Sequence, residues 1–425
     1  MIKKIKFHLK KNEALIKDNL ILFFAIGTAN VLNYFFRFFV GRSLGPEEFG
    51  VFEVLLSLIY VIVIPLTAIQ TTLSKFVAEF KVKNEDKKIA YLFSKSIKKI
   101  GLVGLMVALI FLAVSPILAS FLKIEELSPL IIIGVFMTFT FLIPVLRGFL
   151  QGLQRFKLLG STFIVESLIK IGFGIPLIYW GFGVNGAIWG FMLGFFLPFL
   201  IIFYFVSRLF RSAKEKFESS NIYKYSFPVL IMLVSLTIFY TLDLILVKRF
   251  FDPITAGYYA ALSLFGKVIF FASMSISIVM FPKVSELNSQ NKNTRSLLFK
   301  SLLITLILGA IGSLFYYLTP DLVVNLLFGK EYLIIAPLLG FFGIIMTIYS
   351  LSYVIAYYNI ALQRLKFLYL LGSFNILELI LIYLFHKTIL QVMISLIIVM
   401  VLLFLSLIVY TVKNDKSFNN YPGIQ

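Results

Sequence analysis

The sequence predicts an all-α integral membrane protein with twelve transmembrane helices, arranged as two pseudo-symmetric bundles of six. Hydrophobic residues make up 60% of the 425-residue chain and charged residues only 14%, against about 25% charged in an average soluble domain. The apolar runs are about 20 residues or longer, the length that a helix needs to cross a hydrocarbon core of roughly 30 Å. Short motifs also recur in the same order in both halves, which indicates a duplicated helical unit.

The apolar runs are continuous, whereas the strands of membrane β-barrels alternate in hydrophobicity over about 10 residues, so helices are favoured. Several runs contain proline, which removes a backbone donor and predicts bent helices in a packed bundle. In chain order, the expected spans are 19–40, 49–72, 100–122, 130–150, 158–180, 185–206, 225–247, 257–281, 296–318, 332–357, 367–385 and 390–412. The prolines inside them are Pro65, Pro144, Pro176, Pro198, Pro228 and Pro337.

Three motifs occur once in each half. They are RSLGPEEFG and RFFDPITAG at 42–50 and 249–257, LQRFK and LQRLK at 153–157 and 362–366, and GSTFIVE and GSFNILE at 160–166 and 372–378. Because six is an even number of spans, both copies have the same orientation and are related by an axis along the membrane normal. We therefore expect domains at 1–212, with a cytoplasmic segment 1–18, and at 213–425, with a cytoplasmic tail 413–425.

The formal net charge of +19 is distributed unevenly between the two sides of the predicted bundle. With the N-terminus in the cytoplasm, 30 of the 39 Lys and Arg residues lie on the inner side, 6 on the outer side and 3 within spans. Arg147 and Lys300, near the inner ends of their spans, are counted with the inner side, and Lys248 with an outer loop. This bias follows the positive-inside rule and predicts a multi-pass protein of the cytoplasmic membrane with both termini inside. The excess charge is expected to face anionic lipid headgroups rather than nucleic acid.

Composition and loop length argue against several classes of function. The chain has no cysteine and only two histidines, His8 and His386, so disulfides are excluded and no certain metal site is expected. It contains no phosphate-binding loop of the G-x-x-x-x-G-K-[ST] type. No soluble domain interrupts the spans, which argues against a membrane glycan polymerase or ligase. We therefore expect a protein that is not an enzyme and has no resident cofactor. The acidic residues within the spans leave Na⁺ or H⁺ as a possible coupling ion.

Three stretches resemble a known family. Residues 40–80, VGRSLGPEEFGVFEVLLSLIYVIVIPLTAIQTTLSKFVAEF, resemble the opening of the polysaccharide and oligosaccharide-lipid flippases (Wzx-like) of the multidrug/oligosaccharidyl-lipid/polysaccharide exporter superfamily. RGFLQGLQRFK at 147–157 is similar to the loop after the family's fourth span, and TLDLILVKRFFDPITAGYYAAL at 241–262 to the start of its second half. The resemblance covers essentially the whole chain. It implies a V-shaped pair of six-helix bundles, as in the multidrug (MATE) exporters of that superfamily.

The resemblance also implies a function, namely moving a polyprenyl-(pyro)phosphate-linked oligosaccharide from the inner to the outer leaflet by alternating access. Lipid II flippases typically have two more C-terminal spans, so twelve spans favour the polysaccharide branch. The expected partners are the lipid-linked substrate, membrane lipids and glycan biosynthesis proteins, and the expected functional form is a monomer. A drug or metabolite antiporter of the same superfamily is the first alternative, and a membrane glycan polymerase or ligase the second.

Basic residues within or beside the spans are the candidates for substrate binding. A charged side chain facing lipid costs about 2.5–3.5 kcal/mol even on the insertion scale, so these residues should face the interior or water. An anionic phosphate crossing a low-dielectric bundle needs compensating cations. The candidates are Arg37, Arg42, Lys170 and Lys267.

Acidic and amide residues within the spans are the candidates for ion coupling or gating. They are Glu166, Asp243, Asn375 and Glu378, with a possible Na⁺ site near the last three. A structural alternative is equally open, in which Glu166 and Lys170 form a self-neutralising i,i+4 pair and Arg37 pairs with Asp243. Glu166 and Glu378 end the same repeated motif, but Lys170 follows the first after one turn and Ile382 follows the second. We therefore predict that Glu166 is a paired strut and that Glu378 takes up an ion.

Overall fold

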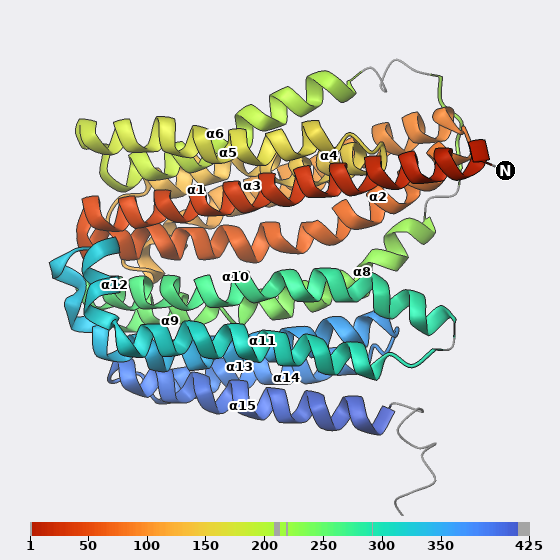
Figure 1. The fold of residues 1–425 in the computed structure, drawn as a ribbon. Helices are drawn as coiled ribbons and strands as arrows, with labels where there is room; N and C mark the ends of the chain where they lie inside the picture. The colour runs from red at the N-terminus through yellow and green to blue at the C-terminus, as the bar shows by residue number, and fades with distance from the viewer. Residues whose placement is uncertain (1, 208–212, 218–219, 291, 415–425) are drawn as a thin grey trace, which may run out of the picture. The chain divides into compact units, whose positions relative to one another are not determined.

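The computed structural model describes residues 2–207, 213–217, 220–290 and 292–414 (Figure 1). The regular secondary structure of these residues is entirely helical, as the sequence predicts. Within the described residues, ten helical stretches are long and apolar enough to cross a membrane. Two of them, Phe24–Val82 and Phe156–Val206, contain 59 and 51 residues, which is room for two crossings each at about 20 residues per crossing. The protein is thus a multi-pass membrane protein, and the count of twelve spans stays a prediction.

The chain divides into two compact units whose boundaries differ from the division at residue 212. Unit 1 contains Met1–Leu44 and Ile62–Leu230, and unit 2 contains Gly45–Val61 and Ile231–Gln425. The segment Gly45–Val61 belongs to unit 2 because it packs against helices of that unit rather than against its sequence neighbours. Residues 225–230, at the start of the seventh predicted span, belong to unit 1.

Unit 1 is built around the contacts of its fourth and sixth helices. Its helices are α1 (Ile2–Val63, of which the first part belongs to this unit), α2 (Thr67–Val82), α3 (Asp86–Phe121), α4 (Ser128–Gly152), α5 (Phe156–Leu177) and α6 (Gly183–Val206). A 3₁₀ turn, Ile64–Leu66, joins α1 to α2, and a π turn, Ile178–Phe182, joins α5 to α6. Helix α4 packs against α2, α3 and α6, while α5 packs along α6.

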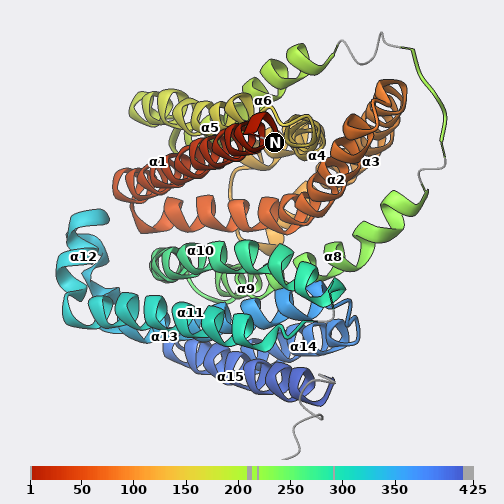
Figure 2. The same ribbon diagram turned by 45° about the vertical axis from the view of Figure 1, so that its right-hand side comes forward.

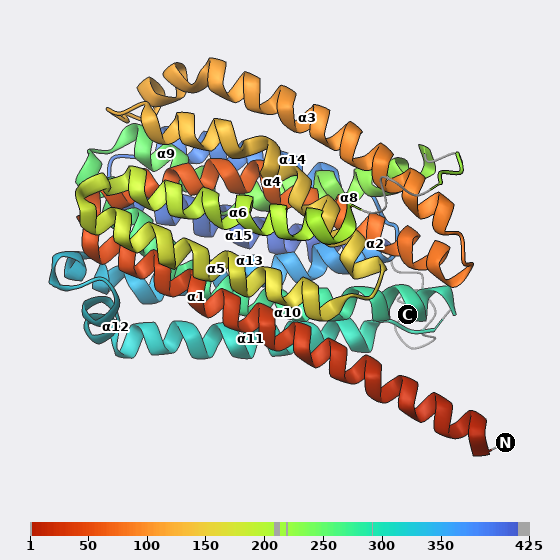
Figure 3. The same cartoon turned by 90° about the horizontal axis from the view of Figure 1, so that it is seen from above.

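Unit 2 is organised around one central helix, α13 (Figure 2). Its helices are α8 (Ser220–Ile238, shared with unit 1), α9 (Leu242–Phe250), α10 (Pro253–Ser289), α11 (Arg295–Leu318), α12 (Pro320–Leu327), α13 (Ala336–Ala361), α14 (Phe367–Leu384) and α15 (Ile389–Asn414). Helix α13 packs against α10, α11 and α15. The short helix α12, which the sequence analysis did not predict, lies beside the C-terminal end of α11 (Figure 3).

The seventh predicted span, 225–247, is not one helix. It consists of α8, which ends at Ile238, and α9, which starts at Leu242. The break places Asp243 in the first turn of α9, where the partial positive charge of a helix N-terminus favours an acidic side chain. Broken helices at membrane depth are tolerated where they are buried in protein, and Asp243 is only 2% exposed.

The first repeated motif restarts a helix in each copy. In the second copy, Asp252 caps α10 by accepting a hydrogen bond from the Thr255 N–H at 3.0 Å, with Pro253 at the first helical position. Hydrogen bonds from the side chain and backbone of Thr255 hold the pKa of Asp252 below its ordinary value. In the first copy, Gly45 precedes Pro46 with φ 75° and ψ 176°. This left-handed backbone suits glycine and bends α1 where the chain passes from unit 1 to unit 2.

The two glycines that end the repeated motif contact each other within unit 2. A Cβ at Gly50 would lie 3.0 Å from the Cα of Gly257, and a Cβ at Gly257 would overlap the carbonyl oxygen of Pro46. The motif is therefore repeated for packing as well as for helix initiation, because only glycine lets the two backbones approach this closely.

Replacing Gly257 with Ala is expected to destabilise unit 2. The obstacle is a backbone carbonyl, which cannot rotate away as a side chain would, so the cost should be at least about 1–3 kcal/mol, as for overpacking. Thermal unfolding in detergent measures it. The matched control is Gly172→Ala, since a Cβ there meets no atom within 4 Å; equal melting temperatures for the two variants would contradict the close packing.

Three glycines on α6 form the helix contact that their four-residue spacing indicates. Gly186 faces the backbone of Leu177, and Gly190 faces the backbone of Gly174. A Cβ at Gly194 would come within 2.6 Å of the Lys170 side chain. These glycines therefore serve packing within unit 1, and Gly194 makes room for one of the candidate site residues.

Candidate functional site

Three charged residues form a buried cluster in unit 1, which we call the N-terminal ionic cluster: Arg147 on α4 and Glu166 and Lys170 on α5. The Glu166 carboxylate accepts from Arg147 Nη2 at its Oε2 and from Lys170 Nζ at its Oε1, each at 2.7 Å. Their side chains are 4–9% exposed. The expected pair between Glu166 and Lys170 is therefore present, and one carboxylate holds two cations.

A polar residue of α1 extends this cluster. The Lys170 ammonium also donates to Asn33 Oδ1 at 3.2 Å. The Asn33 amide in turn donates to the Ser167 hydroxyl at 3.0 Å and to the carbonyl of Ala29 at 2.9 Å. The network thus joins α1, α4 and α5, and it fixes the orientation of Lys170 from two sides.

Aromatic rings surround the two cations of the cluster. The Arg147 guanidinium lies 4.0 Å from the centre of the Phe163 ring, and the Lys170 ammonium lies 4.2 and 4.7 Å from those of Phe191 and Phe195. Such contacts contribute about 0.5–2 kcal/mol each. They help to keep a second positive charge inside the bundle, because one carboxylate cannot neutralise both cations.

A second cluster, the C-terminal carboxylate site, consists of Asp243 on α9 and Asn375 and Glu378 on α14 in unit 2. Asp243 Oδ2 accepts a hydrogen bond from the Tyr259 hydroxyl of α10 at 2.6 Å. Helices α9 and α14 pack against each other, and the carboxylates of Asp243 and Glu378 interact electrostatically. The three candidate residues that the sequence grouped here are therefore brought into one region.

Glu378 differs sharply from its repeat counterpart. It is completely buried, and neither of its oxygens has a hydrogen-bond partner among the described residues. The next turn of α14 presents Ile382, also fully buried, where α5 presents Lys170. An ionised carboxylate in such surroundings is costly unless a proton or cation joins it.

The orphaned oxygens suit a small hard cation. Besides the two of Glu378, Asp243 Oδ1 and Asn375 Oδ1 lack hydrogen-bond partners in the described part of the chain. Carboxylate and amide oxygens are the ligand types that hard cations prefer. No group of three or more His, Cys, Asp or Glu side chains in the described residues suits a metal ion, so any site here combines two carboxylates with an amide.

The four predicted substrate residues are divided between the two compact units. Lys170 belongs to the N-terminal ionic cluster, and Arg37 of unit 1, 5% exposed, acts electrostatically on Lys170. Lys267 of unit 2 is 1% exposed and interacts with Asp243. Arg42 is exposed. Since Arg37 and Asp243 belong to different compact units, their expected pairing stays a prediction.

Two cations were assigned to the wrong environment by counting charges in loops. Arg147 is not an inner-loop residue, because α4 continues to Gly152 and buries it at 7% exposure against Glu166. Lys248 is not an outer-loop residue, because it lies within α9 and is 2% exposed. The counts become 29 inner and 5 outer residues, so the bias persists. Tyr259 was also missed, although its position two residues after the repeated Gly257 was a signal.

The N-terminal two thirds of the chain match a described protein family. Residues 15–288 fit the family described as "Polysaccharide biosynthesis protein". An uncharacterised membrane protein of Methanocaldococcus jannaschii is 23% identical over 296 residues, 64% of this chain and 68% of that protein. Stage V sporulation protein B of Bacillus subtilis is 25% identical over 170 residues, 37% of this chain and 31% of that protein.

Solved structures share the fold at low sequence identity. An inward-facing multidrug transporter of the MATE family has a TM-score of 0.80 and 12% identity, covering 93% of this chain and 96% of that one. The lipid II flippase MurJ, in an inward closed conformation, has a TM-score of 0.73 and 18% identity, covering 94% and 88%. Together with the family match, these likenesses show that the chain belongs to the polysaccharide biosynthesis protein family and has the fold of the multidrug/oligosaccharidyl-lipid/polysaccharide exporters.

Proposed function

We propose that the protein is a flippase that moves a polyprenyl-(pyro)phosphate-linked oligosaccharide from the inner to the outer leaflet by alternating access. One observation carries this proposal. A member of the polysaccharide biosynthesis family buries two charged sites in its membrane-spanning helices, and the two sites differ in their charged groups. Ionisable residues inside a membrane are expensive and mark substrate or ion pathways. The N-terminal ionic cluster has one positive charge in excess, which suits an anionic phosphate.

The C-terminal carboxylate site supplies the proposed coupling to an ion gradient. Uptake of Na⁺ or a proton at Glu378 would satisfy oxygens that no described residue satisfies. A ligand shifts a conformational equilibrium only if it binds the two states differently. We propose that the site binds the ion more tightly in one conformation, so that a gradient biases the inward–outward equilibrium without ATP. The protein then acts as a monomeric transporter in the cytoplasmic membrane, with both termini inside, rather than as an enzyme.

Flipping is tested in liposomes that contain the protein and a fluorescent polyprenyl-pyrophosphate oligosaccharide. A membrane-impermeant quencher reports the fraction of this lipid that lies in the outer leaflet of the liposome. Replacing Lys170 or Lys267 with Ala is expected to abolish flipping in folded protein, and Lys170→Arg to restore part of it, since charge but not geometry is kept. Lys170→Ala should fold, because Arg147 still neutralises Glu166 at 2.7 Å. Normal flipping by both Ala variants would reject these lysines as substrate residues.

A drug or metabolite antiporter is the second candidate, because the inward-facing multidrug transporter shares the fold with a TM-score of 0.80. The same liposomes decide between the two. Gradient-driven uptake of a cationic dye, without flipping of the glycan lipid, would favour the antiporter. The excess positive charge of the N-terminal ionic cluster predicts the opposite result, since it disfavours cationic cargo.

A further inference from the structure

Two serines on α10 are buried without hydrogen-bond partners. Ser273 and Ser277 lie one helical turn apart, are 1% and 0% exposed, and neither hydroxyl has a partner among the described residues. A helical serine ordinarily donates to the carbonyl one turn earlier, as Ser350 on α13 does to Met346 at 2.7 Å. Adjacent buried hydroxyls without partners indicate a place where water or an ion completes their hydrogen bonds.

The packing of α10 along α13 shows what these serines face. The contacts Gly266–Phe342 and Phe281–Tyr357 and the hydrogen bond from Ser285 to the Ala361 carbonyl all follow one parallel register. Continuing that register places Ser273 level with Tyr349 and Ser277 level with Tyr353. The unpartnered serines therefore lie at the same height along the α10–α13 contact as a row of tyrosines on α13.

That row continues along α13 at four-residue spacing. The Tyr353 hydroxyl donates to the Tyr357 hydroxyl at 3.0 Å. Phe270 of α10 packs against both Tyr349 and Tyr353, with ring centroids 4.8 and 5.1 Å away. Since residues four apart share a helix face, hydroxyl-bearing side chains extend along this contact from Tyr349 to Tyr357.

One end of this series reaches the C-terminal carboxylate site. The Glu378 carboxylate interacts electrostatically with the Tyr349 hydroxyl on α13 and with that of Tyr259 on α10. Tyr259 itself donates to Asp243. The hydroxyls of Tyr349 and Tyr259 thus act on the same carboxylate site inside unit 2.

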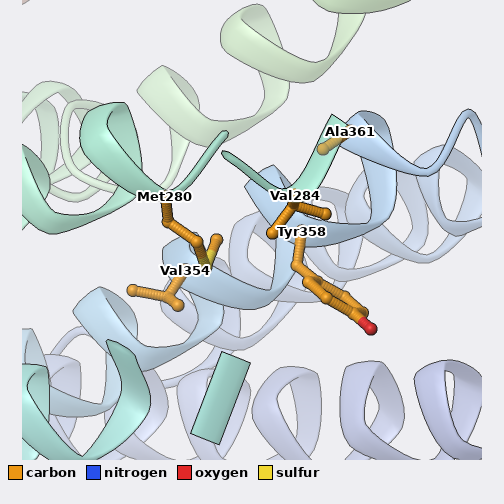
Figure 4. Close-up of a cluster of buried hydrophobic side chains, with 5 residues drawn as sticks. All are labelled: Met280, Val284, Val354, Tyr358 and Ala361. Carbon is orange, nitrogen blue, oxygen red and sulfur yellow. The ribbon is translucent and has the colours of Figure 1, made fainter. Parts of the chain in front are cut away.

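The other end is closed by an apolar cluster near the C-terminal ends of the two helices (Figure 4). It consists of Met280 and Val284 from α10 and Val354, Tyr358 and Ala361 from α13, each at most 6% exposed. Phe281 and Tyr357 pack against it. These ends of α10 and α13 face the cytoplasm in the predicted topology, so we name these five residues the inner plug.

We propose that Ser273, Ser277, Tyr353 and Tyr357 line an internal route through unit 2, by which water and the coupling cation pass between the C-terminal carboxylate site and the cytoplasm. The route rests on the ion coupling proposed above. It lies within unit 2, along the contact between α10 and α13. The inner plug must loosen for passage, because an apolar constriction excludes water and ions.

Cysteine labelling tests the route directly, since the chain has no cysteine of its own. Single Ser273→Cys and Ser277→Cys variants are exposed to a small, charged, membrane-impermeant thiosulfonate in vesicles of either orientation. The matched control is Ala356→Cys on α13, a position that is 0% exposed. We expect the serine variants to react about tenfold faster than the control from the cytoplasmic side, because only a hydrated sulfur forms a thiolate.

Further measurements distinguish a failure of the proposed route from a failure of the proposed ion coupling. Met280→Ala should speed the labelling of Ser277→Cys further, because it removes part of the inner plug. Labelling as slow as that of Ala356→Cys, or faster from the outer side, would overturn the route even if an ion gradient drives transport. Transport that ignores Na⁺ and H⁺ gradients in the wild type would overturn the proposed coupling instead, whatever the labelling rates.

Discussion

Replacing Glu166 with Gln is expected to lower the stability of the protein by about 3–5 kcal/mol, the cost of removing one partner from a buried ion pair. The substitution leaves Arg147 and Lys170 facing each other without a counter-charge, at 8% and 4% side-chain exposure. Gln preserves the size of the side chain, so packing changes little. The loss would therefore be electrostatic in origin.

Thermal unfolding in detergent measures this effect, with two variants as controls. Lys170→Met removes one cation and leaves a neutral pair of Arg147 and Glu166, so it should cost less than Glu166→Gln. The double variant Glu166→Gln/Lys170→Met should recover part of the loss, because a single cation then remains. A Glu166→Gln protein that melts with the wild type would show that the N-terminal ionic cluster does not support the fold.

Replacing Glu378 with Gln is expected to have the reverse effect, abolishing the dependence of transport on ion gradients while changing stability by less than about 1 kcal/mol. Its oxygens have no hydrogen-bond partner in the described residues, so no protein contact is lost. A neutral amide also avoids the cost of a buried charge. Gln can neither be protonated nor attract a cation as a carboxylate does, so the conformational equilibrium should no longer respond to Na⁺ or H⁺.

The measurement is glycan-lipid flipping in liposomes under imposed Na⁺ and H⁺ gradients, with thermal unfolding of the same preparations. Glu286→Gln is the matched control, because Glu286 is an exposed carboxylate of the same unit and should leave both properties unchanged. Glu166→Gln, measured in its folded fraction, should keep its gradient response. If Glu378→Gln retains the full response, the coupling ion binds elsewhere.

Much of the site was predictable from local sequence. Glu166 and Lys170 are four residues apart on one helix, so α-helical geometry alone brings them together, and the structure confirms their pair. The absence of a basic residue one turn after Glu378 could be seen in the same way, because Ile382 occupies that position. The grouping of Asn375 with Glu378 also follows from their spacing on a helix.

Other members of the site come from distant segments, and no local pattern identified them. Arg147 was counted with the inner loop, yet α4 extends to Gly152 and buries it against Glu166. Tyr259 contacts Asp243 across 16 residues because α10 turns back along α9. The orphaned hydroxyls of Ser273 and Ser277 become visible only when every neighbour of α10 is in place.

The sequence by itself determined that this protein spans a membrane as helices, that the same motifs recur in both halves, and that Glu166, Lys170, Asp243, Lys267 and Glu378 lie within the spans. These properties follow from hydrophobic length, periodicity and the cost of charge in lipid, each of which is encoded locally. Only the tertiary structure decided which charges are neutralised. A charge is neutralised only when an opposite charge from another helix lies within a few ångströms, as Arg147 does at Glu166. The packing of segments far apart in the chain sets that distance.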